Sequence, residues 1–120
     1  MERFVKGDIV VVPFPNTDLS PAKRRPAFVI TSLEGDDVII CQITSKAHRD
    51  GYACSLRIED MQRGALRQES AIRPNRLFTM YEGAILYKIG KVKDHKIDEV
   101  ECRLKRILFK NNNQNKNTGA

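Results

Sequence analysis

The chain has 120 residues and a mass of 13.7 kDa, which suits one domain with a hydrophobic core of its own. Hydrophobic residues make up 41% and charged residues 30%, a balance that excludes a wholly disordered protein. Lysine and arginine outnumber aspartate and glutamate by 21 to 15, and the resulting net charge of +6 favours acidic partners without identifying one.

The cysteines and the N-terminal residues predict a cytoplasmic protein. Cys41, Cys54 and Cys102 have no CxxC spacing and no histidine at metal-ligand distance, so neither a disulfide framework nor a metal site is expected. The first apolar run, 9–12, is too short for a signal peptide or a membrane span. We therefore expect reduced thiols, no cofactor and no membrane contact.

β-Branched runs in the first half of the chain predict four strands. The first run stops at Pro13-Phe14-Pro15 because proline removes donors from a β-ladder, and Pro26 lets the second strand begin without its first donor. A polar turn at 34–37 joins the second and third strands into an antiparallel hairpin that is buried on both faces. Strict alternation in the fourth strand indicates a wet face and a place near an edge. The expected strands are 8–14, 27–32, 38–44 and 54–59.

The second half predicts shorter strands and one helix. Residues 70–73 and 76–80 are expected as strands on either side of a Pro74-Asn75 bend, and 89–92 as a further strand. Asp94 is expected to cap a helix whose apolar residues recur at helical spacing and pack across the sheet. These apolar residues are Ile97, Val100, Leu104, Ile107 and Leu108.

Many short strands before a single helix predict a mainly β fold. The expected architecture is a small, strongly bent, barrel-like sheet of five to seven strands with a C-terminal helix. We expect one domain over residues 1–110. The last residues, 111–120, are polar and lack periodicity, which predicts a disordered tail.

The sequence predicts phosphodiester chemistry that does not need a metal. A Gly-rich phosphate loop, HExxH and a nucleophile elbow are all missing from the sequence. RNA can be cut without a metal because its own 2′-OH is the nucleophile, and the protein need only move protons and stabilise charge. Arg25, held by Pro26 at a strand mouth, offers a planar fork for two phosphate oxygens. The alternative is that Lys23, Arg24 and Arg25 form only a solvated loop.

Two further groups of polar residues lie where strands end or bend. Thr44 and Ser45 close the third strand, where their hydroxyls can donate to a phosphate, although simple strand-end capping is the alternative. Arg73, Asn75 and Arg76 offer a second cationic fork and an amide able to read a base edge, or are only turn residues.

Two histidines are acid–base candidates by residue type alone. His48 lies in a polar loop with no partner identifiable from the sequence, and His95 lies in the first turn of the last helix. Neither has a pattern around it that predicts catalysis.

Three blocks of the sequence resemble the MazF/PemK toxins of bacterial toxin-antitoxin systems, especially the PemK-like branch. The blocks are GDIVVVPFPNTDLSPAKRRPAFVIT from Gly7, ICQITS ending at Ser45, and SAIRPNRLFT from Ser70 to Thr79. They occur in the family's order and spacing, so together they are more specific than any one of them. The resemblance covers about residues 5–109.

The resemblance implies a compact, SH3-like barrel toxin that acts as a homodimer and inhibits growth. Its expected activity is metal-independent, sequence-specific cleavage of single-stranded RNA, in which 2′-OH attack leaves a 2′,3′-cyclic phosphate and a 5′-OH end. A cognate antitoxin is expected to silence it, and operator DNA is expected to be bound only through that antitoxin.

The resemblance also assigns roles to individual residues. Arg25 falls on the family's catalytic arginine before proline, Thr44 on its catalytic threonine at a strand end, and Arg73 on an arginine linked to acid–base work or phosphate stabilisation. Residues expected to bind RNA are Lys23, Arg24, Ser45, Lys46, Ser70, Asn75 and Arg76.

The chain departs from the family pattern in two places. Asn75 stands where some members have an aspartate proposed to help proton transfer, and an amide cannot ionise. Leu19-Ser20-Pro21 stands where several relatives have an acidic residue, so the cleavage motif cannot be carried over. The alternatives to an RNA-cutting toxin are a non-enzymatic CcdB-like toxin that acts on a topoisomerase and an inactive interaction barrel.

Overall fold

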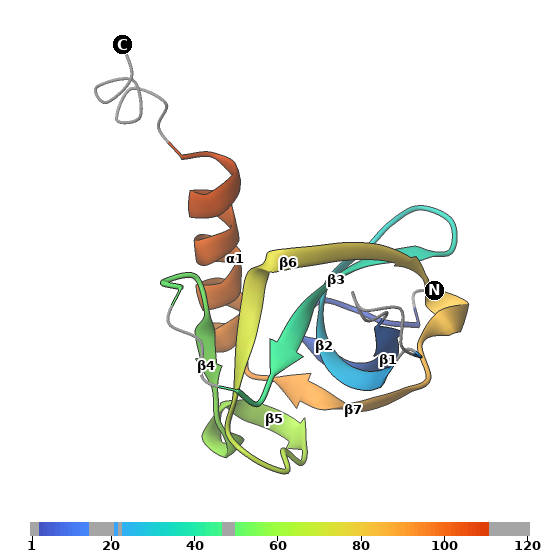
Figure 1. Ribbon diagram of the computed structural model, residues 1–120, viewed down its shortest axis with the longest axis horizontal. Helices are drawn as coiled ribbons and strands as arrows, with labels where there is room; N and C mark the ends of the chain where they lie inside the picture. Colours follow the sequence, from blue (N-terminus) through green and yellow to red (C-terminus); the bar gives the residue numbers. More distant parts are fainter. Residues whose placement is uncertain (1–2, 15–20, 22, 47–49, 111–120) are drawn as a thin grey trace.

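The computed structural model describes residues 3–14, 21, 23–46 and 50–110 (Figure 1). The strands are β1 (Asp8–Phe14), β2 (Lys23–Ser32), β3 (Asp37–Thr44), β4 (Cys54–Leu56), β5 (Met61–Gly64), β6 (Ser70–Tyr81) and β7 (Tyr87–Val92). Two 3-10 turns, η1 (Ile58–Asp60) and η2 (Glu82–Ala84), interrupt them, and helix α1 (Asp94–Leu108) follows. The predicted tail at 111–120 lies outside the described residues.

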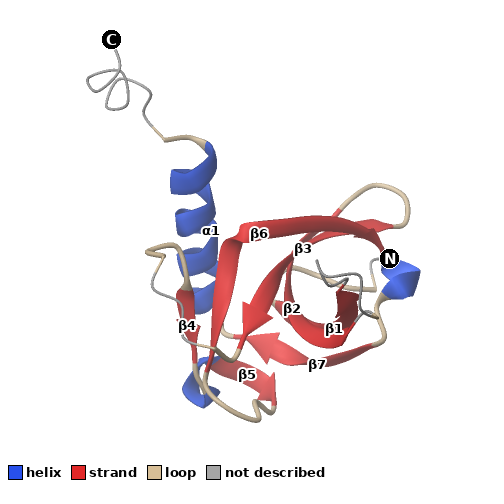
Figure 2. Cartoon of the chain, in the orientation of Figure 1, coloured by secondary structure: helices blue, strands red, loops and turns tan. Residues whose placement is uncertain are grey.

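The strands form one curled, antiparallel sheet. Its order is β4-β6-β3-β2-β1-β7-β5, so β4 lies at an edge as predicted. Figure 2 shows the sheet bending round on itself, with α1 lying beside β6 and β4. The expected mainly β, barrel-like fold with a C-terminal helix is confirmed.

The curled sheet has a hydrophobic core on each of its two faces. Val10, Ala27 and Ile40 belong to the core inside the curve, whereas Ile9, Phe28 and others pack toward α1. Neighbouring residues of a strand point to opposite faces, so β1, β2 and β3 bury both sets, as their unbroken apolar runs predicted. Burial of one side chain such as Phe28 stabilises the fold by about 1.5–3 kcal/mol.

The apolar stripe of α1 packs over the outer core. Ile97 and Val100 are buried and Leu104 is partly buried against that core, but Leu108, at the end of the helix, is 56% exposed. The predicted cap is wrong: Asp94 is the first helical residue, and Lys93 is the N-cap without a side-chain hydrogen bond. A contact with a distant part of the chain takes the place of a side-chain cap at the start of α1.

That contact comes from η1, because the Asp60 carbonyl accepts the Lys93 N–H at 2.8 Å. The Asp60 carboxylate lies 3.7 Å from Lys96 Nζ and 3.3 Å from His95 Nε2, so it also holds the first turn of α1.

No helix among the residues the structure describes is long and apolar enough to cross a membrane.

Two strand boundaries differ from those predicted near Pro26 and Leu56. β2 begins at Lys23 rather than at residue 27, because β1 pairs with it as far as Phe14 opposite Lys23. Pro26 lies just outside the ladder with β3, which begins at Ala27, so its missing N–H does not interrupt that ladder. The predicted strand 54–59 ends at Leu56, and the chain turns through η1 into β5 instead.

The two strands predicted on either side of Pro74-Asn75 are a single strand, β6. Leu77 pairs with Cys41 and Arg73 pairs with the next residue of β3, Gln42, so residues 74–76 form a bulge between two halves that share one partner. The bulge places Asn75 and Arg76 on the surface beside the end of β3.

Candidate functional site

Arg25 and Thr44 lie at the ends of neighbouring strands and belong to the same face of the sheet. The ladder between β2 and β3 ends with Ala27 opposite Gln42. One step of two residues further out, the antiparallel register brings Arg25 and Thr44 to matching positions on that face. Thr44 is also paired with Ala71 of β6. The face is the continuation of the inner core surface to which Ala27 belongs.

The Thr44 hydroxyl is held in place and still has a donor to offer. Thr44 is 9% exposed, and its Oγ1 accepts the backbone N–H of Lys46 at 3.1 Å. This is the strand-end capping that the sequence allowed. Because a hydroxyl that accepts a hydrogen bond keeps its own O–H, capping leaves Thr44 able to donate to an anion.

Arg73 belongs to the same face, directly across from Gln42. Its side chain is 14% exposed, and its Nη2 lies 3.2 Å from Oδ2 of Asp50. Its Nε atom is buried without a hydrogen-bond partner in the described part of the chain, and so is Oε1 of Gln42. The guanidinium therefore has a donor, Nε, that the described part of the chain does not use.

Asp50, which the sequence did not single out, binds the two polar residues at the β6 bulge. Its Oδ2 accepts hydrogen bonds from Arg73 and, at 3.4 Å, from Asn75 Nδ2, while Oδ1 accepts the Tyr52 N–H at 3.0 Å. The hydrogen bond from the Tyr52 N–H is the main cause that holds the pKa of the Asp50 carboxyl below its usual range; desolvation opposes it, and the hydrogen bond and charge of Arg73 add to the lowering. The carboxylate is therefore ionised at neutral pH.

The loop that carries Asp50 is tied to α1. Nη1 of Arg103 donates to the carbonyl oxygens of Gly51 at 3.3 Å and Ala53 at 3.0 Å. Gly51 has a φ of +81°, a left-handed conformation that suits glycine in the turn between Asp50 and Tyr52. A helix on one face of the sheet thus fixes the backbone that places Asp50 beside the bulge of β6.

Other predicted residues surround this group. Lys23 and Arg24 are exposed at the start of β2, Ser45 and Lys46 are exposed just after β3, and Arg76 is exposed on the β6 bulge. Of the predicted site cations, Arg73 alone forms an ion pair with a carboxylate that the structure describes. The end of the sheet is therefore rich in positive charge that is not neutralised from within the described chain.

Some candidates lie elsewhere. Neighbouring residues of β6 point to opposite faces, and Ser70 lies three residues before Arg73, so the two belong to opposite faces. The Ser70 hydroxyl donates to the Gln68 carbonyl. His95 binds Asp60 at the start of α1, and His48 lies outside the described residues. Phe14 and Phe78 pack edge-to-face with ring centroids 4.9 Å apart and belong to the inner core, so neither ring is free to stack a base.

The thiols do not supply a nucleophile at this site. Cys41 and Cys54 are buried, and desolvation by burial is the main cause that raises the pKa of Cys54 to about 11 and that of Cys41 further still. In the part of the chain that the structure describes, no cluster of three or more His, Cys, Asp or Glu side chains is placed to hold a metal ion.

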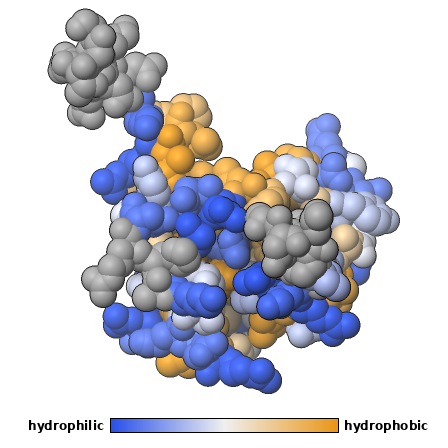
Figure 3. Space-filling model, in the orientation of Figure 1, coloured by the Kyte–Doolittle hydropathy of each residue, from blue (hydrophilic) through white to orange (hydrophobic). Residues whose placement is uncertain are grey.

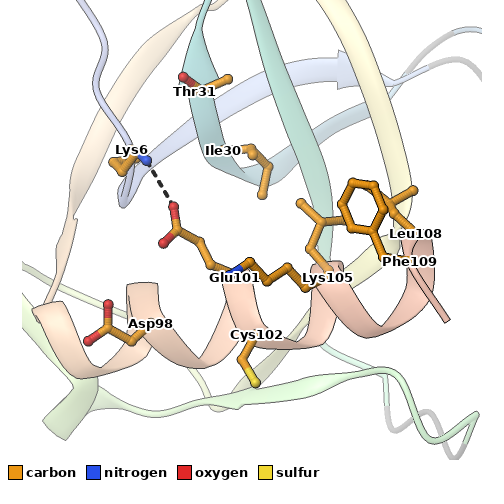
Figure 4. A pocket seen from close by; sticks show the side chains of 10 residues that line it. Lys6, Ile30, Thr31, Asp98, Glu101, Cys102, Lys105, Leu108 and Phe109 are labelled. Carbon is orange, nitrogen blue, oxygen red and sulfur yellow. Dashed lines mark hydrogen bonds and ion pairs between the residues drawn. The ribbon is translucent and has the colours of Figure 1, made fainter. Parts of the chain in front are cut away.

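A hollow beside α1 lies away from these residues. It has a volume of about 600 Å³ between the helix and β2, and the Lys6–Glu101 ion pair of 2.9 Å spans its side (Figure 4). Figure 3 shows apolar surface gathered near the end of α1, where Phe109 is 78% exposed. The predicted site is thus a shallow polar surface at the strand ends rather than this hollow.

The fold is similar to that of three solved structures. Mycobacterium tuberculosis toxin MazF-mt6 has a TM-score of 0.65 at 14% identity, covering 82% of this chain and 93% of its own. An endoribonuclease in complex with its cognate antitoxin, from a mycobacterial species, has a TM-score of 0.69 at 10% identity, covering 90% and 97%. A mycobacterial endoribonuclease has a TM-score of 0.67 at 12% identity, covering 90% and 93%. A comparison with curated proteins finds no match.

The sequence itself matches a family model over almost the whole described domain. The model describes a PemK-like, MazF-like toxin of type II toxin-antitoxin systems, and the match covers residues 5–108. It includes every strand, α1 and all the residues that the three sequence blocks singled out. The chain therefore belongs to the PemK-like, MazF-like family of type II toxin-antitoxin toxins.

Proposed function

We propose that the protein is an endoribonuclease toxin that cuts single-stranded RNA at short sequences without a metal. The 2′-OH of one nucleotide gives up its proton and attacks the adjacent phosphorus, the bond to the 5′-oxygen of the next nucleotide breaks, and that oxygen takes up a proton. The products are a 2′,3′-cyclic phosphate and a 5′-OH end. A protein performs this reaction by orienting the linkage, moving protons and stabilising the charge on the phosphorane.

Three side chains carry the proposed chemistry. The Arg25 guanidinium binds two phosphate oxygens and stabilises the added charge, and the Thr44 O–H donates to a non-bridging oxygen. Arg73 steadies the charge that develops near the leaving oxygen. The observation that supports this most is the register of β2 and β3, which brings Arg25 and Thr44 to matching positions on one face at the open end of their ladder.

The surrounding cations bind the neighbouring parts of the RNA. Unpaired phosphates are attracted to exposed lysines and arginines, and an exposed aromatic ring can stack an unpaired base. Tyr52, 43% exposed beside Asp50, is the aromatic residue best placed for stacking. The residues proposed to bind RNA are Lys23, Arg24, Ser45, Lys46, Asn75 and Arg76, with Ser70 further away on β6.

The proposed partners follow from the family. One of the similar structures is an endoribonuclease in complex with its cognate antitoxin. We propose that a cognate antitoxin also binds this chain, and that it silences the toxin. We further propose a homodimer and contact with operator DNA only through the antitoxin. The +6 net charge fits both an RNA substrate and an acidic antitoxin segment.

Purified protein incubated with RNA of mixed sequence in excess EDTA tests the activity. The proposal predicts fragments with 5′-OH and 2′,3′-cyclic phosphate ends, read by end-specific labelling, because no step needs a metal. Intact RNA, together with growth arrest on expression in cells, would instead favour a CcdB-like toxin. Intact RNA and harmless expression would favour an inactive barrel.

A further inference from the structure

Three donors from two segments of the chain converge on the Asp50 carboxylate. Arg73 Nη2 lies 3.2 Å from Oδ2, Asn75 Nδ2 lies 3.4 Å from the same oxygen, and the Tyr52 N–H donates to Oδ1 at 3.0 Å. A guanidinium, a side-chain amide and a backbone N–H are also the donors that proteins use to hold a phosphate of a nucleic acid. These three donors are therefore suited to an anion, and in the free protein the anion that they bind is the Asp50 carboxylate.

The carboxylate is accessible and weakly held. The side chains of Arg73 and Asp50 are 14% and 27% exposed, so water reaches the pair, and ion pairs open to solvent are weak. Arg73 also has a buried Nε donor without a partner among the described residues. A multivalent anion that contacts several cations at once can therefore compete with Asp50 for this guanidinium.

The neighbourhood favours a nucleic-acid phosphate over a lone small anion. Arg73 shares its face of the sheet with Arg25 and Thr44. Two strand spacings of about 4.8 Å, together with a step of two residues along the strands, put the Cα atoms of Arg25 and Arg73 about 12 Å apart. Exposed Arg76 follows Asn75 in the β6 bulge, and exposed Lys46 lies just past the end of β3. A chain of phosphates can therefore reach Arg25 and Arg73 together.

We infer that Arg73, Asn75 and the Tyr52 amide form a binding site for one phosphate of the RNA backbone, and that the Asp50 carboxylate occupies this site until RNA displaces it. The inference rests on the proposed RNA substrate and adds a step to it. In the free protein, the Asp50 carboxylate balances the charge of Arg73. Arg73 becomes available to the RNA when this carboxylate is displaced. No bond is made or broken in this exchange.

The test is binding of a 2′-O-methyl RNA, which cannot be cut because its 2′-oxygen is blocked. Asp50→Asn removes the charge and keeps an oxygen to accept the Tyr52 N–H. We expect the variant to bind about two- to fivefold more tightly than the wild type at low salt, the equivalent of one exposed ion pair that no longer needs to be broken. Because Arg73 contacts the same phosphate in both complexes, the slope of log K against log[salt] should be nearly the same for the variant and the wild type.

Two control variants separate this effect from a change in net charge. Glu101→Gln changes the net charge by the same amount and also frees a lysine, Lys6, from an exposed ion pair. Glu101 lies on α1, however, and not beside Arg73. Glu101→Gln should leave RNA binding nearly unchanged. In an Arg73→Ala background, Asp50→Asn should no longer tighten binding, because the cation that it releases is missing.

The outcomes distinguish the inference from the proposed function. If wild-type protein cuts unmodified RNA but Asp50→Asn binds the methylated RNA no better than Glu101→Gln does, the phosphate site is wrong and the function stands. Weaker binding by Asp50→Asn would also overturn it, since Asp50 would then be holding Arg73 ready for RNA. If wild-type protein neither binds nor cuts RNA, both proposals fall.

Discussion

Gln42 and Arg73 are paired directly across β3 and β6, and each keeps one buried polar atom, Oε1 and Nε respectively, without a hydrogen-bond partner in the described chain. Buried polar atoms are nearly always satisfied in folded proteins, so two orphans side by side mark a place that something else completes. They lie next to the position shared by Arg25 and Thr44. The unsatisfied pair thus agrees with a ligand site at this end of the sheet.

Gln42→Leu should therefore be nearly neutral for folding or stabilise the protein, by up to about 1 kcal/mol. Replacing a buried, unsatisfied acceptor by an apolar group removes a desolvation cost without breaking a hydrogen bond. Urea unfolding of the variant and the wild type measures this change in the free energy of unfolding, provided that the two proteins have the same m-value. A loss of more than about 2 kcal/mol would mean that Oε1 of Gln42 has a partner in solution that stabilises the fold.

Asp60→Asn should destabilise the protein by about 1–3 kcal/mol, because it weakens the contacts that hold η1 to the first turn of α1. The Asp60 side chain is 11% exposed and accepts the Arg57 N–H at 2.8 Å besides contacting His95 and Lys96. As a matched control, Glu69→Gln removes an exposed ion pair of 3.9 Å with Arg57 and should change stability by less than about 0.5 kcal/mol. Equal effects of the two variants would contradict this role of Asp60.

The same carboxylate makes stability depend on acid pH. Burial raises the pKa of Asp60, but the hydrogen bonds from Arg57 and His95 and the charge of Lys96 outweigh burial and leave the pKa below its usual range. A lowered folded-state pKa gives stability that is present above the ordinary pKa of 3.8 and is lost as pH falls through the folded value. The wild type should therefore lose more stability than Asp60→Asn between pH 5 and pH 3, measured by urea midpoints.

The thiols should react at different rates with a disulfide reagent at neutral pH. Cys102 is exposed, whereas Cys54 and Cys41 are buried with raised pKa values, so both reactive thiolate and access are lacking at the latter two. We expect one fast-reacting thiol in the native protein and three after denaturation. Mass mapping that finds Cys54 labelled as fast as Cys102 would show that the packing between β4 and α1 opens readily.

The central strands could be predicted from the sequence because local and tertiary signals agree there. The runs in β1 and β3 are apolar on both faces, and both strands are paired on both sides by other strands. β6 could not be predicted as one strand, because Pro74-Asn75 is locally a strong bend and only the shared partner β3 keeps its two halves in line. The start of α1 was also mispredicted because a tertiary contact decides it: the Lys93 N–H donates to the Asp60 carbonyl, and Asp94 does not act as a local cap.

Arg25, Thr44 and Arg73 could be proposed from sequence blocks, but Asp50 could not. Asp50 lies 23 residues from Arg73 and 25 from Asn75 in the chain, in a loop without a distinctive pattern. The Arg103 contacts that fix this loop come from α1, 50 and 52 residues away. A carboxylate placed by a helix on the other side of the sheet leaves no periodic signal in the sequence.

The most direct test of the account is the rate of RNA cleavage in excess EDTA by Arg25→Ala and Thr44→Ala, measured at saturating protein. Far-UV circular dichroism and urea midpoints would verify that both variants are folded, and Glu101→Gln would serve as a matched surface control. Each of the two variants should cut at least about 100-fold more slowly than the wild type, because each lacks a group that stabilises the transition state. Arg25→Lys should restore little, since an ammonium cannot hold two phosphate oxygens as a guanidinium does. Wild-type rates from folded Arg25→Ala or Thr44→Ala would contradict the assignment of the catalytic site to the ends of β2 and β3.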